Sequence, residues 1–183
     1  SVSWQRCLAT THGQGYQDCK IFASGSQDRS ICIKDIRSGS ATSTDKPDID
    51  LEDAHASGVH TVQFNPYGSD HLLLSGAMDP VLKVWDIRHM DNKQGPLYAF
   101  TGHVQSNKKM KYITPPAFLS DTRVVTGGEA SFTLSIYGWD EGGEGRTISR
   151  GELPADPSNV TVQHTGKGIY VAAACRSDIY VLQ

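Results

Sequence analysis

The stretch LLLSGAMDPVLKVWDIR, from Leu72 to Arg88, carries the main structural signal of this sequence, because it recurs 51 residues earlier in the chain. The earlier copy is IFASGSQDRSICIKDIR, from Ile21 to Arg37, and the two copies align without a gap. Each copy reads as a strand, a turn that contains an aspartate, and a second strand with alternating apolar and polar side chains. This repetition predicts a chain built from several copies of one strand–turn–strand motif.

Two weaker copies follow further along the chain, namely RVVTGGEASFTLSIYGWD from Arg123 to Asp140 and IYVAAACRSDIYVLQ from Ile169 to Gln183. Additional strand-like runs, such as VHTVQFNP from Val59 to Pro66, precede these hairpins. No segment of helical length shows a sustained apolar period of about 3.6 residues. The chain is therefore predicted to be all-β, in units of four short strands that cover residues 1–53, 54–102 and 103–158, with a partial unit at 159–183.

The second unit resembles a WD repeat, which is one blade of a β-propeller. The markers of the family are a histidine before the innermost strand, a serine in the second strand, an aspartate in the turn, and a Trp-Asp pair that ends the third strand. In this unit they correspond to His55, Ser75, Asp79 and the pair Trp85-Asp86. The resemblance implies that the His, Ser, Asp and Trp side chains form a structural network of hydrogen bonds.

The other units match these markers less completely. The first unit has Ser24 and Asp28 but carries Lys34 where the tryptophan is expected. The third unit has His103, Thr126 and the pair Trp139-Asp140.

The number of blades is unusual for the family that the chain resembles. The sequence contains about three and three-quarter blades, whereas propellers close with about 4–8 blades and WD rings commonly have about seven. We therefore expect the C-terminal part of a larger, seven-bladed ring, completed by an N-terminal half or by a second chain. A closed four-bladed ring and a ring made from two copies are the alternatives.

One set of residues has the composition of a catalytic site. His55, Ser75 and Asp79 have the residue types of a hydrolase triad, but the sequence contains no GxSxG motif to present a nucleophile. It also contains no HExxH or CxxC…HxxxH motif for a metal and no P-loop for a nucleotide. The sequence thus predicts a non-catalytic protein with no metal, no cofactor and no small-molecule substrate.

Composition narrows the class of partner and the compartment. The 183 residues include 17 basic and 20 acidic side chains, a net charge of −3, so an electrostatic grip on nucleic acid is not expected. No apolar run reaches the length of about 20 residues that a membrane-spanning helix needs. The four cysteines are scattered and no signal peptide is recognisable, which predicts reduced thiols in an intracellular protein of the nucleus or cytoplasm.

The most specific functional pointer is a repeated Asp-x-Arg box at the end of the third strand. The boxes are Asp35-Ile36-Arg37 and Asp86-Ile87-Arg88, one repeat apart. Tandem boxes of this kind resemble those of the substrate receptors of cullin-4 ubiquitin ligases, which implies that Arg37 and Arg88, with Asp35 and Asp86, bind the ligase adaptor. An arginine has the forked donors needed to pair with carboxylates across such an interface.

A second resemblance concerns the segment from Asp53 to Met90, DAHASGVHTVQFNPYGSDHLLLSGAMDPVLKVWDIRHM. It is similar to WD proteins that act as histone chaperones, which implies histones as partners. The sequence therefore leaves three hypotheses: a general scaffold for protein–protein interactions, a receptor that docks the cullin-4 adaptor, and a histone-binding protein. A further hypothesis, from a different functional class, is an enzyme or metal protein that uses the His, Ser and Asp residues.

Overall fold

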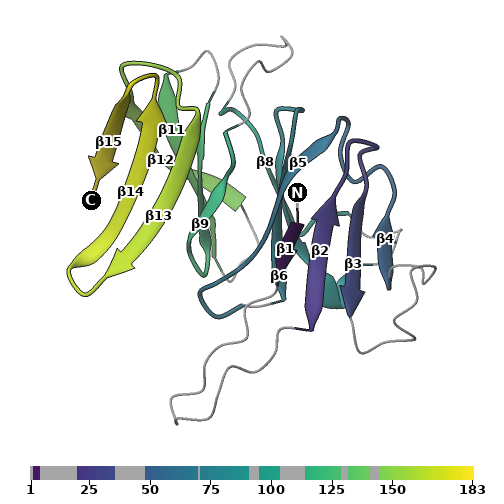
Figure 1. Ribbon diagram of the computed structural model, residues 1–183. Helices are drawn as coiled ribbons and strands as arrows, with labels where there is room; N and C mark the ends of the chain where they lie inside the picture. Colours follow the sequence, from purple (N-terminus) through teal and green to yellow (C-terminus); the bar gives the residue numbers. More distant parts are fainter. Residues whose placement is uncertain are drawn as a thin grey trace.

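The computed structural model describes the backbone of residues 2–4 and, in full, residues 20–35, 48–69, 71–90, 95–103, 114–128, 132–140 and 145–183. These residues form four separate antiparallel sheets, joined in a row along the chain (Figure 1). The three-residue turn η1 (Ile87–His89) is the one helical element among them. The prediction of an all-β fold made of propeller blades is confirmed.

Each of the first three sheets has four strands that follow one another in chain order. The first sheet contains β1 (Val2–Trp4), β2 (Ile21–Gly25), β3 (Ile31–Asp35) and β4 (Ile49–Leu51). The second sheet contains β5 (Val59–Phe64), β6 (Leu72–Ala77), β7 (Leu82–Asp86) and β8 (Tyr98–Phe100). The third sheet contains β9 (Ala117–Ser120), β10 (Arg123–Gly127), β11 (Thr133–Trp139) and β12 (Gly145–Glu152).

The fourth sheet has three strands, β13 (Asn159–Thr165), β14 (Gly168–Cys175) and β15 (Asp178–Leu182). Within the described residues, no fourth strand covers the outer edge of β15. The expectation of a final unit that lacks its outermost strand therefore agrees with the strand order of this sheet.

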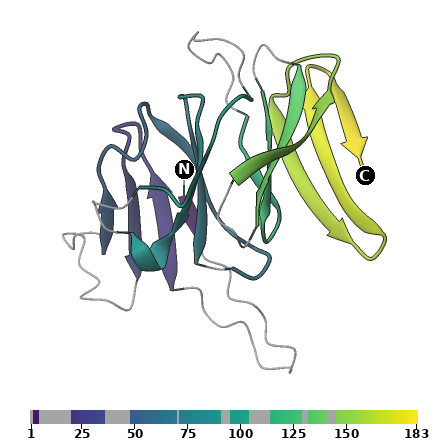
Figure 2. The same ribbon diagram turned by 180° about the vertical axis from the view of Figure 1, so that it is seen from behind.

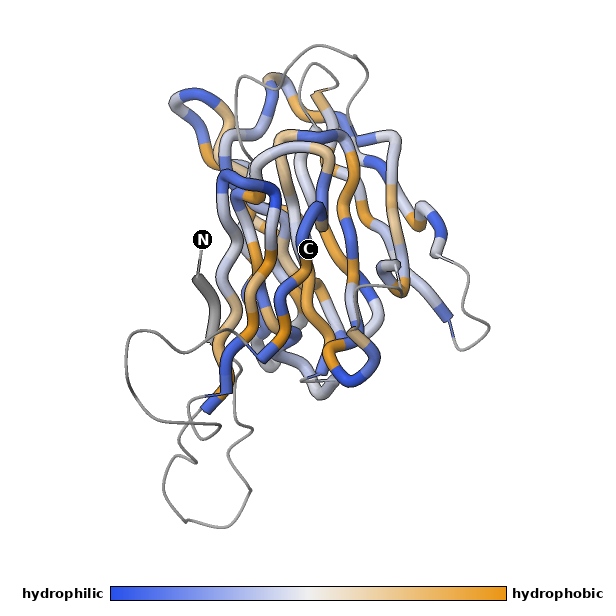
Figure 3. The backbone as a smooth tube through the Cα atoms, turned by 90° about the vertical axis from the view of Figure 1, so that its right-hand side faces the viewer, coloured by the Kyte–Doolittle hydropathy of each residue, from blue (hydrophilic) through white to orange (hydrophobic). Residues whose placement is uncertain are grey.

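Neighbouring sheets pack face to face, because every strand alternates its side chains between two faces. The alternation of apolar and polar residues along the strands is visible in Figure 3. Between the first and second sheets lie Ala23, Ile31 and Ile33 on one side and Phe64 and Trp85 on the other. Comparable apolar clusters join the second sheet to the third and the third sheet to the fourth.

Three glycines at intervals of 51 residues set how closely the sheets approach, namely Gly25, Gly76 and Gly127. Each follows the hydroxyl-bearing residue of its second strand. A Cβ atom on Gly25 would lie 2.5 Å from the Val59 side chain of the next sheet, and one on Gly76 would lie 3.2 Å from Pro116. A Cβ atom on Gly127 would overlap Pro157. The repeated glycine therefore leaves room for the segment that begins the following sheet.

A polar clasp also ties the second sheet to the third at the turns between their first two strands. The Asp121 carboxylate accepts hydrogen bonds from the Asn65 side-chain amide at 3.0 Å and from the Ser69 backbone N–H at 2.9 Å. Asn65 donates a further bond to the Asp121 carbonyl at 3.0 Å. Because this aspartate satisfies donors of another sheet, it fixes the two sheets relative to each other.

Candidate functional site

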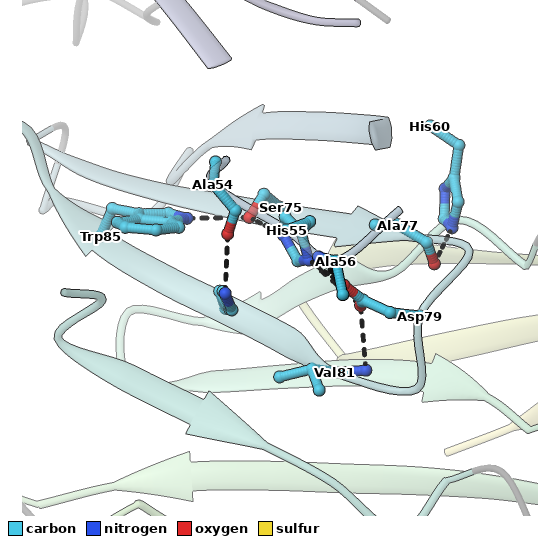
Figure 4. A network of polar contacts seen from close by, with 10 residues as sticks. Ala54, His55, Ala56, His60, Ser75, Ala77, Asp79, Val81 and Trp85 are labelled. Carbon is cyan, nitrogen blue, oxygen red and sulfur yellow. Dashed lines mark hydrogen bonds and ion pairs between the residues drawn. The ribbon is translucent and has the colours of Figure 1, made fainter. Parts of the chain in front are cut away.

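The second sheet contains a continuous network of hydrogen bonds that links four side chains (Figure 4). The Trp85 indole N–H donates to the Ser75 hydroxyl at 2.8 Å, and Ser75 lies 2.8 Å from Nε2 of His55. Nδ1 of His55 lies 3.1 Å from both carboxylate oxygens of Asp79. The turn between β6 and β7 is thereby connected to the strand interior and to the segment that precedes β5.

The geometry fixes the direction of each bond in this network. A carboxylate can only accept, so Nδ1 of His55 carries the proton and donates it to Asp79. In the neutral imidazole Nε2 then accepts, so the Ser75 hydroxyl donates to His55 while its oxygen accepts from Trp85. Each bond of the network thus joins one donor to one acceptor, and such pairing is what makes a buried polar network stable.

Asp79 is held in its charged form by this arrangement. Burial by itself would raise the pKa of the carboxyl group, but the hydrogen bond from His55 and the backbone N–H groups of Ala56 and Val81 outweigh it, and the pKa is lowered. Asp79 therefore remains an acceptor for His55 at neutral pH.

The order Asp79–His55–Ser75 has the connectivity of a hydrolase triad, but the site does not present a nucleophile. Ser75 is 0% exposed and its oxygen is already bonded to the Trp85 indole. His55 is buried as well. The Ser75 hydroxyl is thus enclosed and already paired, unlike the accessible hydroxyl of an activated nucleophile.

The third sheet departs from the sequence-based interpretation in the position of its tryptophan. Trp85 pairs with Leu73, two residues before Ser75, and the residue that pairs with Val124, two residues before Thr126, is Tyr137. Tyr137 thus occupies the place of Trp85, and the expectation for Trp139 was wrong in register by two residues. The Tyr137 hydroxyl donates to the Thr101 carbonyl at 2.9 Å and lies 3.4 Å from Nδ1 of His103.

Trp139 instead belongs to an aromatic stack between the second and third sheets. Its ring stacks on Tyr98 with centroids 5.0 Å apart, and Phe100 stacks on Tyr137 at the same separation. These residues come from β8 and β11. No local sequence pattern predicts this stack, because β8 and β11 are distant in the chain and only packing brings them together.

The first sheet lacks the network in its described part. Lys34 stands opposite Phe22 in the register position of Trp85, and its ammonium group lies 3.7 Å from the Asp48 carboxylate. Asp28, the turn aspartate, accepts from the Ser30 backbone N–H at 3.1 Å and from the Ser30 hydroxyl at 2.6 Å. Its carboxylate is thus bonded within its own turn.

The Asp-x-Arg box of the second sheet forms a compact ionic turn. Asp86 caps η1 by accepting from the Arg88 backbone N–H at 3.0 Å. The guanidinium returns to the same carboxylate with two bonds, from Nε at 3.0 Å and from Nη2 at 2.7 Å. His89 approaches it at 3.3 Å. The bonds from Arg88 are the main cause that lowers the pKa of Asp86 well below its usual value.

The arginine of this turn remains accessible. The Arg88 side chain is 58% exposed while that of Asp86 is mostly covered. In the first box, the Asp35 backbone N–H donates to the Asp48 carboxylate at 2.6 Å. Arg37 lies outside the described residues, so the structure places one of the two predicted arginines.

The residues that the structure describes contain neither a metal-binding cluster nor a membrane-spanning helix. No group of three or more His, Cys, Asp or Glu side chains in this part of the chain is arranged to hold a metal ion. In the same residues, no helix is long and apolar enough to cross a bilayer. The described cysteines, Cys32 and Cys175, are free thiols.

The described geometry is that of a β-propeller segment with one complete WD-type network. Consistent with this, residues 49–86 match the family model for the WD domain, G-beta repeat. The match runs from β4 to β7, so the sequence repeat combines the last strand of one sheet with the first three strands of the next. The resemblance to WD repeats is thus confirmed, and the second sheet is the unit in which it is complete.

Two known proteins illustrate the similarity. The chain is 31% identical over 112 residues to Restriction of telomere capping protein 1 of Eremothecium gossypii, an alignment that spans 59% of this chain and 8% of that protein. Its fold is similar to the crystal structure of the computationally designed Ika8 protein, with a TM-score of 0.60 and 23% identity. That similarity covers 90% of this chain and 43% of the designed one.

Proposed function

We propose that this chain is a non-catalytic scaffold for protein–protein interactions that docks an acidic segment of its partner on the Asp86–Arg88 turn. Arg88 carries the proposal, because it combines 58% exposure with an orientation fixed by two bonds to Asp86. A guanidinium that is already ordered loses less conformational entropy on binding than a freely rotating one. WD repeats generally mediate binding to other proteins, which supports the proposal that this chain is an interaction scaffold.

The partner class that we favour is the adaptor of cullin-4 ubiquitin ligases, on the resemblance of the two Asp-x-Arg boxes. Histones are the alternative that the similarity of residues 53–90 suggests. The chemistry of the Asp86–Arg88 turn favours an acidic partner over histones. An exposed guanidinium attracts carboxylates and repels the basic side chains that dominate histone tails.

The experiment is a binding measurement between the purified chain and the cullin-4 adaptor, with Arg88→Ala as the variant. Loss of a guanidinium that pairs with a desolvated carboxylate is expected to weaken binding by about 2–5 kcal/mol. Combining it with Arg37→Ala tests the first box. Arg146→Ala is the matched control, because Arg146 is also exposed on a turn-proximal strand, 3.7 Å from Asp140.

Arg146→Ala should unfold at the wild-type temperature, since exposed ion pairs contribute little to stability. Arg88→Ala should remain folded but be slightly less stable, because it removes bonds to the mostly covered Asp86 carboxylate. Equal binding by wild type and Arg88→Ala, or no adaptor binding by the wild type, would remove the ligase proposal. Histone binding that survives Arg88→Ala would transfer the function to the alternative partner.

A further inference from the structure

The Asp86–Arg88 turn borders a pair of aromatic rings at the rim where β7 and β11 end. Figure 2 shows η1, drawn in teal, at the lower end of the second sheet. Val84 pairs with Tyr98, and Asp86 follows Val84 by two residues, so Asp86 and Tyr98 are diagonal neighbours on one face, about 7–8 Å apart. Tyr98 in turn stacks on Trp139 with ring centroids 5.0 Å apart. Because Arg88 bonds to the Asp86 carboxylate, the ionic turn and the ring pair form one continuous surface.

The aromatic stack between the second and third sheets is buried at Phe100 and Tyr137, which are 3% and 1% exposed. Tyr98 and Trp139 are only partly buried, so they present ring surface at the rim. Tryptophan, tyrosine and arginine are the residues that carry most of the binding energy at protein interfaces. A Trp–Tyr pair beside an ordered arginine therefore has the composition of an interaction site.

The two ends of this surface differ in the charge that they present. At one end, the Arg88 side chain is 58% exposed and that of Asp86 only 11%, so the guanidinium faces the solvent. At the other end, next to Trp139, both partners of an ion pair are accessible, with Arg146 71% and Asp140 54% exposed. An acidic group is therefore favoured at the first end and gains little at the second.

This asymmetry favours a peptide over a nucleic acid. Burial and the nearby Asp140 carboxylate both raise the pKa of the Tyr98 phenol, so the negative charge of Asp140 reaches the ring pair. A single-stranded nucleic acid stacks its bases on such rings, but it carries a phosphate at every nucleotide and would bring charge to both ends. A peptide can place one carboxylate at Arg88 and an apolar side chain at the rings.

We propose that the docking site at Arg88 continues onto Tyr98 and Trp139, and that it binds an extended partner segment with an acidic residue and a large apolar residue about two to four positions apart. The inference rests on the proposed docking of an acidic segment at Arg88. The spacing follows because an extended chain advances about 3.3 Å per residue, and the rings begin about 7–8 Å from Asp86. The carboxylate pairs with the guanidinium while the apolar side chain covers the exposed part of the rings.

The test is selection of random twelve-residue peptides, displayed on phage, against the purified chain and its variants. The wild type should enrich peptides that combine the acidic and apolar residues at this spacing. Arg88→Ala should lose the preference for the acidic residue, and Trp139→Ala the preference for the apolar one. Each variant should keep the other preference, which shows that it is folded. Phe132→Ala is the matched control, because Phe132 is 49% exposed but precedes the opposite end of β11, and it should keep both preferences.

A selected peptide then tests the contact on the wild-type protein, without any change to its fold. Replacing the apolar residue of the peptide with serine should weaken binding about tenfold or more in fluorescence anisotropy, as expected for a side chain that covers an interface hot spot. A benzophenone side chain at the same peptide position should crosslink to β8 or to the end of β11 on irradiation. Crosslinking to any other part of the chain would refute the placement.

The outcomes separate this inference from the proposed function on which it rests. An Arg88-dependent preference for acidic residues without an apolar preference would overturn the aromatic contact and leave the docking at Arg88 intact. The absence of any acidic preference that depends on Arg88 would overturn both. An oligothymidylate that binds more tightly than the selected peptide, and loses its binding in Trp139→Ala, would assign the rings to nucleic acid and also overturn the inference.

Discussion

The Trp85 indole nitrogen lies 2.8 Å from the Ser75 hydroxyl, and both side chains are buried. This single contact connects β7 to β6 through their side chains, in addition to the backbone ladder between them. On its other flank, the ammonium group of Lys83 lies 5.6 Å from the Trp85 ring centroid and donates to the Ala54 carbonyl at 2.6 Å. Trp85 therefore joins the hydrogen-bond network of the second sheet to its apolar contact with the first.

Trp85→Phe tests the contribution of this donor. The ring remains apolar and aromatic, but the Ser75 oxygen loses its hydrogen bond inside a buried site, so the free energy of unfolding should fall by about 1–3 kcal/mol. Urea unfolding measures the loss. Trp139→Phe is the control, because Trp139 contributes ring stacking with Tyr98 and Phe100 and should cost less. A Trp85→Phe protein as stable as the wild type would contradict the structural role of the network.

Gly127→Ala tests the close approach between the third and fourth sheets. The added Cβ atom would overlap Pro157 and would lie 2.9 Å from Thr114, so the segments must move apart. Overpacking of this kind typically costs about 1–3 kcal/mol of stability. Gly151→Ala is the control, because a Cβ atom there meets nothing within 4 Å. That control should be neutral or slightly stabilising in thermal unfolding, and equal destabilisation by both variants would refute the steric argument.

His103 predicts a dependence of stability on pH. Burial lowers the pKa of this histidine from 6.5 to about 4, so the unfolded chain binds a proton that the folded chain does not. Stability should be complete above about pH 6.5 and fall as the pH drops toward 4, by up to about 3 kcal/mol. His60, whose pKa burial also lowers, acts in the same direction.

The measurement is urea unfolding at a series of pH values between 7.5 and 4 for the wild type and for His103→Gln. The variant should be less stable at neutral pH, because it disturbs a buried site, but its stability should vary less with pH. The same pH slope in both proteins would show that His103 does not titrate as described.

Much of the fold was readable from the sequence, because it depends on local patterns that repeat. The alternation of apolar and polar residues identifies strands, and the spacing between Ser24 and Ser75 shows that the same unit occurs twice. Turn aspartates and the residues around them mark where each hairpin reverses. These signals need no knowledge of distant contacts, so they sufficed for an all-β fold of propeller blades.

Pairing register and packing between sheets were decided only by the tertiary structure. Trp139 and Tyr137 are both aromatic residues near the end of one strand, and the backbone ladder that pairs Tyr137 with Val124 determines which of them takes the position of Trp85. Asp28 and Asp79 occupy equivalent turns, yet one bonds to Ser30 and the other to His55. The clasp between Asn65 and Asp121 joins turns 56 residues apart. Such choices depend on which side chains meet in space, and a linear pattern does not contain that information.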